Sequence, residues 1–172
     1  MSNWIDEIKN SIPEHASDIA DSLDLVFNDN ELDEIDAHAC ALASAISAGN
    51  GELAFEISMN GPLLGSAERE AAKTAAALMG MNNVYYSFSD SEAGHEIKSL
   101  APNLKTDSYG TFGGVSEKQF EMYCLACSIA NRSDYCVKLH SQALKGLGLN
   151  TVQLQSIARI VAVVSAIGKI AI

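Results

Sequence analysis

Four residues whose side chains could carry out chemistry lie within one predicted helix-turn-helix: Glu121, Ser133, Cys136 and His140. They supply a carboxyl group, a hydroxyl, a thiol and an imidazole. The last three stand at positions i, i+3 and i+7 of a plausible helix, so they share one stripe and His140 lies one turn beyond Cys136. A thiol with a neighbouring base is a candidate nucleophile.

The predicted start of this helix favours a reactive thiol. We expect Ser133 to cap the helix with its side-chain oxygen, which puts Cys136 in the first helical turn. The helix dipole alone moves a thiol pKa from about 8.5 to about 7. His140, with Glu121 reaching across from the preceding helix, is expected to supply the remaining activation. In the alternative interpretation Ser133 only caps, Cys136 belongs to the core and His140 is a solvated helix residue.

The spacing of these residues resembles that of a known family. Glu121, a site twelve residues later at Ser133, Cys136 three residues on and His140 four further look like the alkyl hydroperoxide reductase D (AhpD) proteins of the carboxymuconolactone decarboxylase-like superfamily. Their pattern is Glu, Cys, Cys, His. The resemblance covers nearly the whole chain and includes the start of the motif helix at Phe120 and the stretch AAALMGMNNVYY, residues 75–86.

The resemblance implies a fold and an activity. The family is all-helical and oligomeric, commonly trimeric. Its helical Cys-x-x-Cys pair reduces organic hydroperoxides, or passes electrons from a dihydrolipoyl-bearing protein to a partner peroxiredoxin. By this resemblance Cys136 matches the inner, peroxide-reactive cysteine, and Glu121 and His140 match the proton relay that activates it. No bound cofactor is implied, because the electrons come from the dihydrolipoyl group of a partner.

Ser133 departs from the family pattern, which has the outer redox cysteine at that position. The family also often has a second histidine just before the inner cysteine, where this chain has Tyr135. A dithiol couple needs two thiols, so turnover should be blocked or rerouted. Cys136 could still become a sulfenic acid, which would persist, overoxidise or be capped by an external thiol. The serine is either native or an engineered Cys-to-Ser exchange of the kind that traps mixed disulfides.

The other cysteines are interpreted as core. Cys124 and Cys127 form a Cys-x-x-Cys of their own in the motif helix, and Cys124 shares a face with Glu121, so it could replace the missing thiol. Their small, apolar neighbours instead favour burial, as they do for Cys40. The remaining histidines lack ligand spacing to any cysteine, so metal binding is not expected; they are His15, His38 and His95.

Composition predicts one all-helical domain over residues 1–172. Hydrophobic residues make up 48% of the chain, while aromatics reach only 6% and prolines number three, which favours helices over sheets. Four unpaired cysteines and no expected signal peptide point to a reducing cytoplasm. The longest apolar stretch, residues 160–168, spans nine residues and is too short for a bilayer.

The net charge of −11 is concentrated at the N-terminus, where residues 1–36 carry eleven acidic residues and only Lys9 as a base. Nucleic acid is therefore not expected as a partner. The acidic stripe is interpreted as a solvated helical face, with docking of a basic partner as the alternative.

The helices that must position the four residues can be predicted from local capping and turn residues. The chain resembles an AhpD-like helical bundle with two related halves, approximately 31–87 and 116–170, displaced by 83 residues. In the first half Leu53 and Ile57 stand where Cys136 and His140 stand in the second, which places function in the C-terminal half. An irregular segment near 88–115 connects the halves. Helices are predicted near 3–10, 14–27, 31–48, 51–59, 66–87, 116–131, 134–147 and 151–170.

Two apolar helical stretches, 70–80 and 158–168, suggest that one chain cannot cover all of its apolar surface, so we expect a homo-oligomer, a trimer or a multiple of it. The stretch 79–86 could line that interface, close over the thiol or fill core, and core is the default interpretation.

The leading hypothesis is a thiol-dependent antioxidant oxidoreductase. Its rivals are a non-redox acid-base enzyme of the decarboxylase type and a helical assembly module without chemistry.

Overall fold

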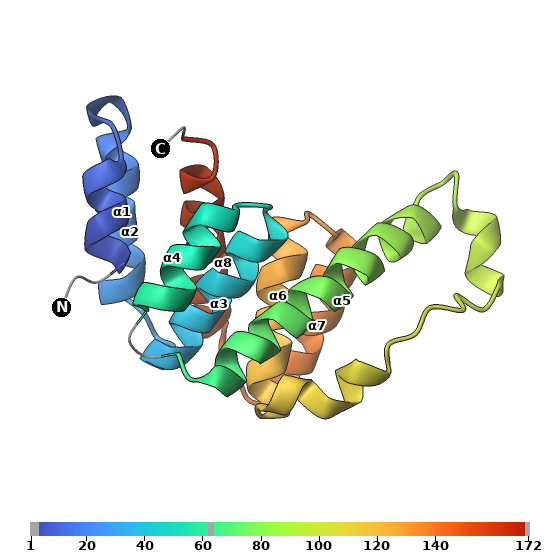
Figure 1. The fold of residues 1–172 in the computed structure, drawn as a ribbon. Coiled ribbons are helices and arrows are strands. Elements are labelled where there is room, and N and C mark those ends of the chain that lie inside the picture. The colour runs from blue at the N-terminus through green and yellow to red at the C-terminus, as the bar shows by residue number, and fades with distance from the viewer. Residues whose placement is uncertain (1–3, 62–63, 171–172) are drawn as a thin grey trace.

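The computed structural model describes residues 4–61 and 64–170, and in these ranges it consists of helices without strands (Figure 1). The predicted all-α class is confirmed. None of the helices in the described ranges combines the length and apolar character that a membrane crossing demands. The α-helices are α1 (Trp4–Ser11), α2 (Ser17–Asn28), α3 (Glu34–Ser47), α4 (Gly51–Asn60), α5 (Ser66–Asp90), α6 (Glu117–Ala130), α7 (Asp134–Gly146) and α8 (Thr151–Ile167). Three short 3-10 helices are η1 (Glu14–Ala16), η2 (His95–Ser99) and η3 (Asp107–Gly114).

The predicted boundaries lie within one residue of the observed ones except at four places. Helix α3 begins at Glu34 instead of 31, and α8 ends at Ile167 instead of 170. The helix expected over 14–27 is divided, because Ala16 leaves the helical region at φ −124° and ψ 24° between η1 and α2. Helix α5 continues to Asp90 instead of ending at 87. Hydroxyls near its end bond back to carbonyls, Ser89 to Tyr86 and Ser91 to Phe88, and these bonds satisfy groups that a helix end leaves free.

Two central helices, α3 and α6, form the core of the bundle. Residues 37–45 of α3 and 120–128 of α6 are buried throughout. Alanine predominates along α3, and small side chains let helices approach closely: the Cys127 sulfur lies 3.6 Å from the carbonyl oxygen of Ala43. The prediction that Cys40, Cys124 and Cys127 are core residues is confirmed, since each is 0% exposed.

Both apolar stretches expected to leave an uncovered patch are largely covered within the single chain. Most of 70–80 packs its alanine face inward, and the branched side chains of 158–168 are buried, because α5 lies against α3 and α6 while α8 lies against α2, α3 and α6. That argument for self-association is therefore wrong. Large apolar side chains are exposed elsewhere, on the second half of α5, the segment after it and α7; they include Val84, Phe88, Leu100, Leu104, Tyr135 and Leu139.

The segment that joins the two halves extends away from the bundle. The C-terminal part of α5, η2 and the chain up to η3 project to one side of the molecule, and η3 brings the chain back to the start of α6 (Figure 1). The turn at the end of η3 is tight: Phe112 and Gly113 have φ of 50° and 59°, and Gly113 packs directly on α5. This contact fixes where η3 lies.

The related-halves interpretation stays a prediction. The helices follow in the same order in each half, α3, α4, α5 and α6, α7, α8. Leu53 and Cys136 are each the third residue of their helix, and Leu53 and Ile57 are both 0% exposed. The first half therefore places apolar, buried side chains at the positions that carry a thiol and an imidazole in the second.

Replacing Gly113 by alanine should lower the free energy of unfolding by about 2 to 4 kcal/mol. Alanine is strained at a φ of 59°, and its Cβ would lie 2.6 Å from the Cα of Ala71. The matched control is Gly110→Ala, whose Cβ meets nothing within 4 Å. Urea unfolding followed by circular dichroism measures both, and equal midpoints for the two variants would contradict the proposed contact.

Candidate active site

The two helices that carry the site are α6 and α7. A capping box starts α6: the Ser116 hydroxyl accepts from the Gln119 backbone and the Gln119 side chain accepts in return, which satisfies two free backbone donors. Helix α7 follows a tight turn in which Arg132 has a φ of 56°. Ser133 occupies the expected N-cap position, but its side chain makes no capping hydrogen bond.

The hydroxyl of Ser133 is instead engaged across the interface with α5. It is 1% exposed and accepts a hydrogen bond from the Ser87 hydroxyl at 3.0 Å. The capping role predicted for Ser133 is therefore wrong, because α5 lies close enough to offer its oxygen a different partner. Ser133 also lowers the pKa of the Cys136 thiol by stabilising its ionised form.

A buried carboxyl and imidazole pair joins α6 to α7. The His140 Nδ1 lies 2.8 Å from Glu121 Oε2, and the two side chains are only 4% and 6% exposed. The Tyr109 hydroxyl, from η3, donates to the other carboxylate oxygen of Glu121. Burial and this hydrogen bond together raise the pKa of Tyr109 above its ordinary range. Both oxygens of Glu121 are thus occupied, as a buried carboxylate requires.

The second imidazole nitrogen of His140 meets a sulfur atom of α5. Its Nε2 lies 3.2 Å from the Met79 Sδ, and a thioether is only a weak hydrogen-bond acceptor. On another side the Tyr109 ring stacks on the imidazole, with centroids 6.4 Å apart and an angle of 25°. The imidazole is therefore oriented from three sides, and one of its nitrogens faces a displaceable side chain.

Cys136 lies one turn before His140 on the same helix and is 2% exposed. Burial raises the pKa of its thiol, and the hydrogen bond from Ser133 opposes that rise. Among the described residues, neither His140 nor Glu121 is hydrogen-bonded to the Cys136 sulfur. The expected pKa near neutrality is therefore wrong, because burial raises the pKa of Cys136 more than Ser133 lowers it.

Cys124 belongs to the same neighbourhood. The nearby charges of Glu121 and an ionised Cys136 raise the pKa of the Cys124 thiol, but burial raises it most. Thiolates, and not thiols, attack disulfides and sulfenic acids. As it stands in this conformation, Cys124 is a poor replacement for the missing outer cysteine.

The structure thus brings Glu121 close to His140, and Ser133 close to Cys136, along one side of α7. The other groups that complete the site were not found from sequence. Tyr109 comes from the segment predicted to be irregular, and no periodic signal singled it out. The α5 residues stand four apart on a single helix face, a spacing that only becomes informative once α7 is known to pack there; they are Met79, Asn83 and Ser87.

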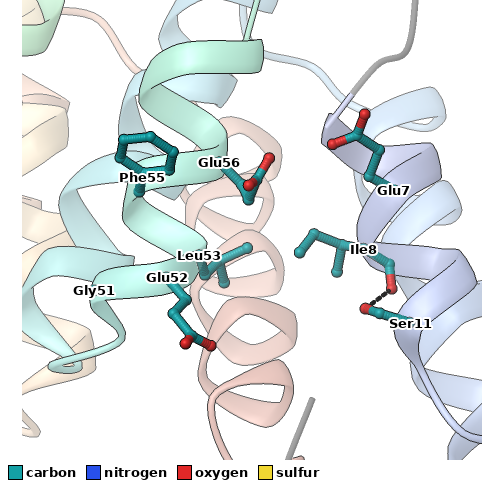
Figure 2. A pocket seen from close by; sticks show the side chains of 8 residues that line it. All are labelled: Glu7, Ile8, Ser11, Gly51, Glu52, Leu53, Phe55 and Glu56. Atoms are coloured by element: carbon teal, nitrogen blue, oxygen red, sulfur yellow. Dashed lines mark hydrogen bonds between the residues drawn. The ribbon is translucent and has the colours of Figure 1, made fainter.

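Two surface cavities accompany this arrangement. One of about 310 Å³ opens beside Tyr135, whose ring stacks on Tyr86 with centroids 5.3 Å apart. The other, of about 530 Å³, lies between α1 and α4, where Ile8 and Leu53 face each other and carboxylates such as Glu56 stand at the rim (Figure 2). Neither cavity is lined by any of the predicted site residues Glu121, Ser133, Cys136 and His140. No cluster of three or more histidine, cysteine or acidic side chains suited to a metal ion occurs within 4–61 and 64–170.

Comparison with known proteins adds a relationship over almost the full length. The pattern of the carboxymuconolactone decarboxylase family matches residues 103–171. The chain is 35% identical to an alkyl hydroperoxide reductase AhpD of Maricaulis maris over 96% of both chains. It is 33% identical to the AhpD of Methylocella silvestris, over 93% of this chain and 90% of the relative. The AhpD of Hyphomonas neptunium is also 33% identical, over 96% and 92%.

The alkylation rate of Cys136 should depend on pH as that of a thiol without an activating base does. Because only the thiolate reacts and burial raises the pKa, the rate of alkylation by iodoacetamide should rise about tenfold per pH unit from about pH 7 to about pH 9. Mass analysis of the Cys136 peptide measures it site by site. The urea-unfolded chain serves as control and should level off at the ordinary thiol pKa, while a plateau near neutrality in the folded protein would contradict the burial effect.

Proposed function

The chain belongs to the alkyl hydroperoxide reductase AhpD family, and from this relationship we propose that it is a thiol-dependent oxidoreductase that reduces organic hydroperoxides through Cys136. The observation that carries the proposal is the buried Glu121–His140 pair one helical turn from Cys136. A base oriented by a second group beside a nucleophile is the arrangement that thiol chemistry needs. The relatives are named for peroxide reduction.

In the proposed reaction the Cys136 thiol gives its proton to the His140–Glu121 pair, directly or through water. The thiolate attacks the terminal peroxide oxygen, the O–O bond breaks, and the alkoxide takes a proton and leaves as alcohol. Two adjustments of the resting arrangement are needed. Cys136 is 2% exposed, so its surroundings must open, and Met79 must turn away from the His140 Nε2, which its unbranched side chain permits.

Ser133 limits the chemistry to one half of a cycle. A serine cannot form the internal disulfide that releases a sulfenic acid or a mixed disulfide. We propose that this chain stops at oxidised or adducted Cys136 unless an external thiol resolves it. The hydrogen bond from Ser133 to the thiol still supports formation of the thiolate.

The proposed partners follow from the same cycle. A dihydrolipoyl-bearing protein is the electron donor and a peroxiredoxin the alternative acceptor, in a reducing, cytoplasmic setting that suits four unpaired cysteines. We also propose that the chain forms a homo-oligomer. Its support is the exposed apolar surface on the second half of α5 and on α7, where Val84 is 73% and Leu139 51% exposed.

A second candidate function is a non-redox acid-base enzyme in which Glu121 and His140 act without thiol cycling. Two observations favour it: the decarboxylase family pattern covers residues 103–171, and burial raises the pKa of the Cys136 thiol. The discriminating variant is Cys136→Ala, which should retain an acid-base activity and abolish a thiol-dependent one.

One equivalent of an organic hydroperoxide should add a single oxygen atom at Cys136, because a sulfenic acid is the first product. Intact-mass and peptide analysis locate the oxygen, and a dimedone adduct identifies the sulfenic acid. Cys136→Ala is the control and should take up no oxygen. A parent protein that stays unmodified at Cys136 would remove the redox proposal.

Restoring the second thiol by Ser133→Cys should convert a single-turnover protein into one that completes many turnovers with a dihydrolipoyl donor. Consumption of hydroperoxide over time measures turnover. The double variant Ser133→Cys, Cys136→Ala controls for the new thiol acting alone. If Ser133→Cys forms its disulfide and still shows no peroxide turnover, the acid-base candidate becomes the better interpretation.

A further inference from the structure

Asn83, in the middle of α5, is buried without hydrogen-bond partners. It is 3% exposed, and both its Nδ2 and its Oδ1 lack a partner. Within 4–61 and 64–170 it is the one buried carboxamide of which this is true. A buried amide left in this way destabilises the fold. The Asn83 carboxamide is therefore a candidate for binding a ligand that offers both a donor and an acceptor.

Two contacts that flank Asn83 fix where it faces. Four residues before it, Met79 touches the His140 imidazole at 3.2 Å, and four residues after it, Ser87 bonds Ser133 at 3.0 Å. Higher numbers on α5 thus meet lower numbers on α7, so the two helices run antiparallel.

The pairing of α5 with α7 also identifies the α7 residue that lies level with Asn83. Positions four apart on a helix lie on one face, one turn from each other. One turn along α5 from Met79 leads to Asn83, and one turn back along α7 from His140 leads to Cys136. This register puts the unpartnered carboxamide of Asn83 level with Cys136, on the α5 face that contacts α7.

We propose that Asn83 is a catalytic residue, whose carboxamide binds the hydroperoxyl group of an organic hydroperoxide while Cys136 attacks it. This inference rests on the proposed function. A hydroperoxyl group carries one O–H donor and oxygen acceptors, and a carboxamide carries the complement, N–H donors and one acceptor oxygen. The Oδ1 accepts from the terminal O–H, and the Nδ2–H donates to the oxygen bonded to carbon.

The donor on that second oxygen acts where charge develops. The Cys136 thiolate forms an S–O bond with the terminal oxygen, which keeps its hydrogen and becomes the sulfenic acid hydroxyl. The O–O bond breaks, and its electron pair leaves with the alkoxide, which recovers from the His140–Glu121 pair the proton that the thiol gave up. Sulfur is oxidised by two electrons and the peroxide is reduced by two. A donor preorganised for the alkoxide stabilises the transition state more than the bound substrate.

The test is Asn83→Leu, which keeps the side-chain size and removes both polar atoms. The rate constant for oxidation of Cys136 by cumene hydroperoxide should fall about 100-fold. Alkylation of Cys136 by iodoacetamide, which needs no hydroperoxyl site, should stay within about twofold, and the urea midpoint should stay equal or rise because an unsatisfied buried amide is gone. The matched control is Asn82→Leu, the adjacent asparagine, which lies off the Met79, Asn83 and Ser87 stripe. Should the leucine variant fail to fold, Asn83→Ala removes the same group without adding bulk.

The outcomes of this test separate the role of Asn83 from the proposed function of the protein. Unchanged oxidation by cumene hydroperoxide in Asn83→Leu overturns the inference and leaves the proposed function intact. An equal fall in oxidation and alkylation also overturns it, because Asn83 would then act on the thiol and not on the peroxide. If Cys136 of the parent protein is not oxidised at all, the proposed function fails and this inference fails with it.

Discussion

The arrangement of this protein depends on a carboxylate and an imidazole held together away from water. Glu121 sits in the wholly buried stretch of α6, where an unpaired charge would be strongly destabilising. Its two oxygens are taken by His140 of α7 and Tyr109 of η3. One side chain therefore ties two elements, α7 and η3, to the central helix, and both satisfy its buried oxygens.

The same burial that protects this pair restrains the nucleophile next to it. Cys136 combines a position favourable to a thiolate, in the first turn of a helix and hydrogen-bonded by Ser133, with a surrounding that opposes ionisation. Desolvation prevails in the closed arrangement. Helix α5 contacts the site at two points, through Met79 on His140 and Ser87 on Ser133, and a buried thiol that stays neutral is a weak nucleophile.

The two halves of the chain contribute differently to this arrangement. In the first half the positions that correspond to the thiol and the imidazole hold Leu53 and Ile57, fully buried, so α4 serves packing where α7 serves chemistry. The first half nevertheless reaches the site through α5, whose long C-terminal part leaves the bundle (Figure 1). This part exposes apolar side chains such as Val84 and Phe88.

The all-helical class, most helix boundaries and the placing of Cys136 and His140 one turn apart follow from the amino-acid sequence, because helical periodicity and end signals are local properties of the chain. The sequence also placed Glu121 on the preceding helix within reach of His140, and the resemblance to the AhpD family assigned both residues to one proton relay. Three features depend on how the helices pack. The Ser133 hydroxyl bonds Ser87 instead of capping, Tyr109 and Met79 complete the surroundings of His140, and 70–80 and 158–168 are covered within one chain. The reason is physical: the pKa of a thiol and the partners of a buried polar group are set by neighbours that lie far away in sequence, and no local pattern records which of them will pack there.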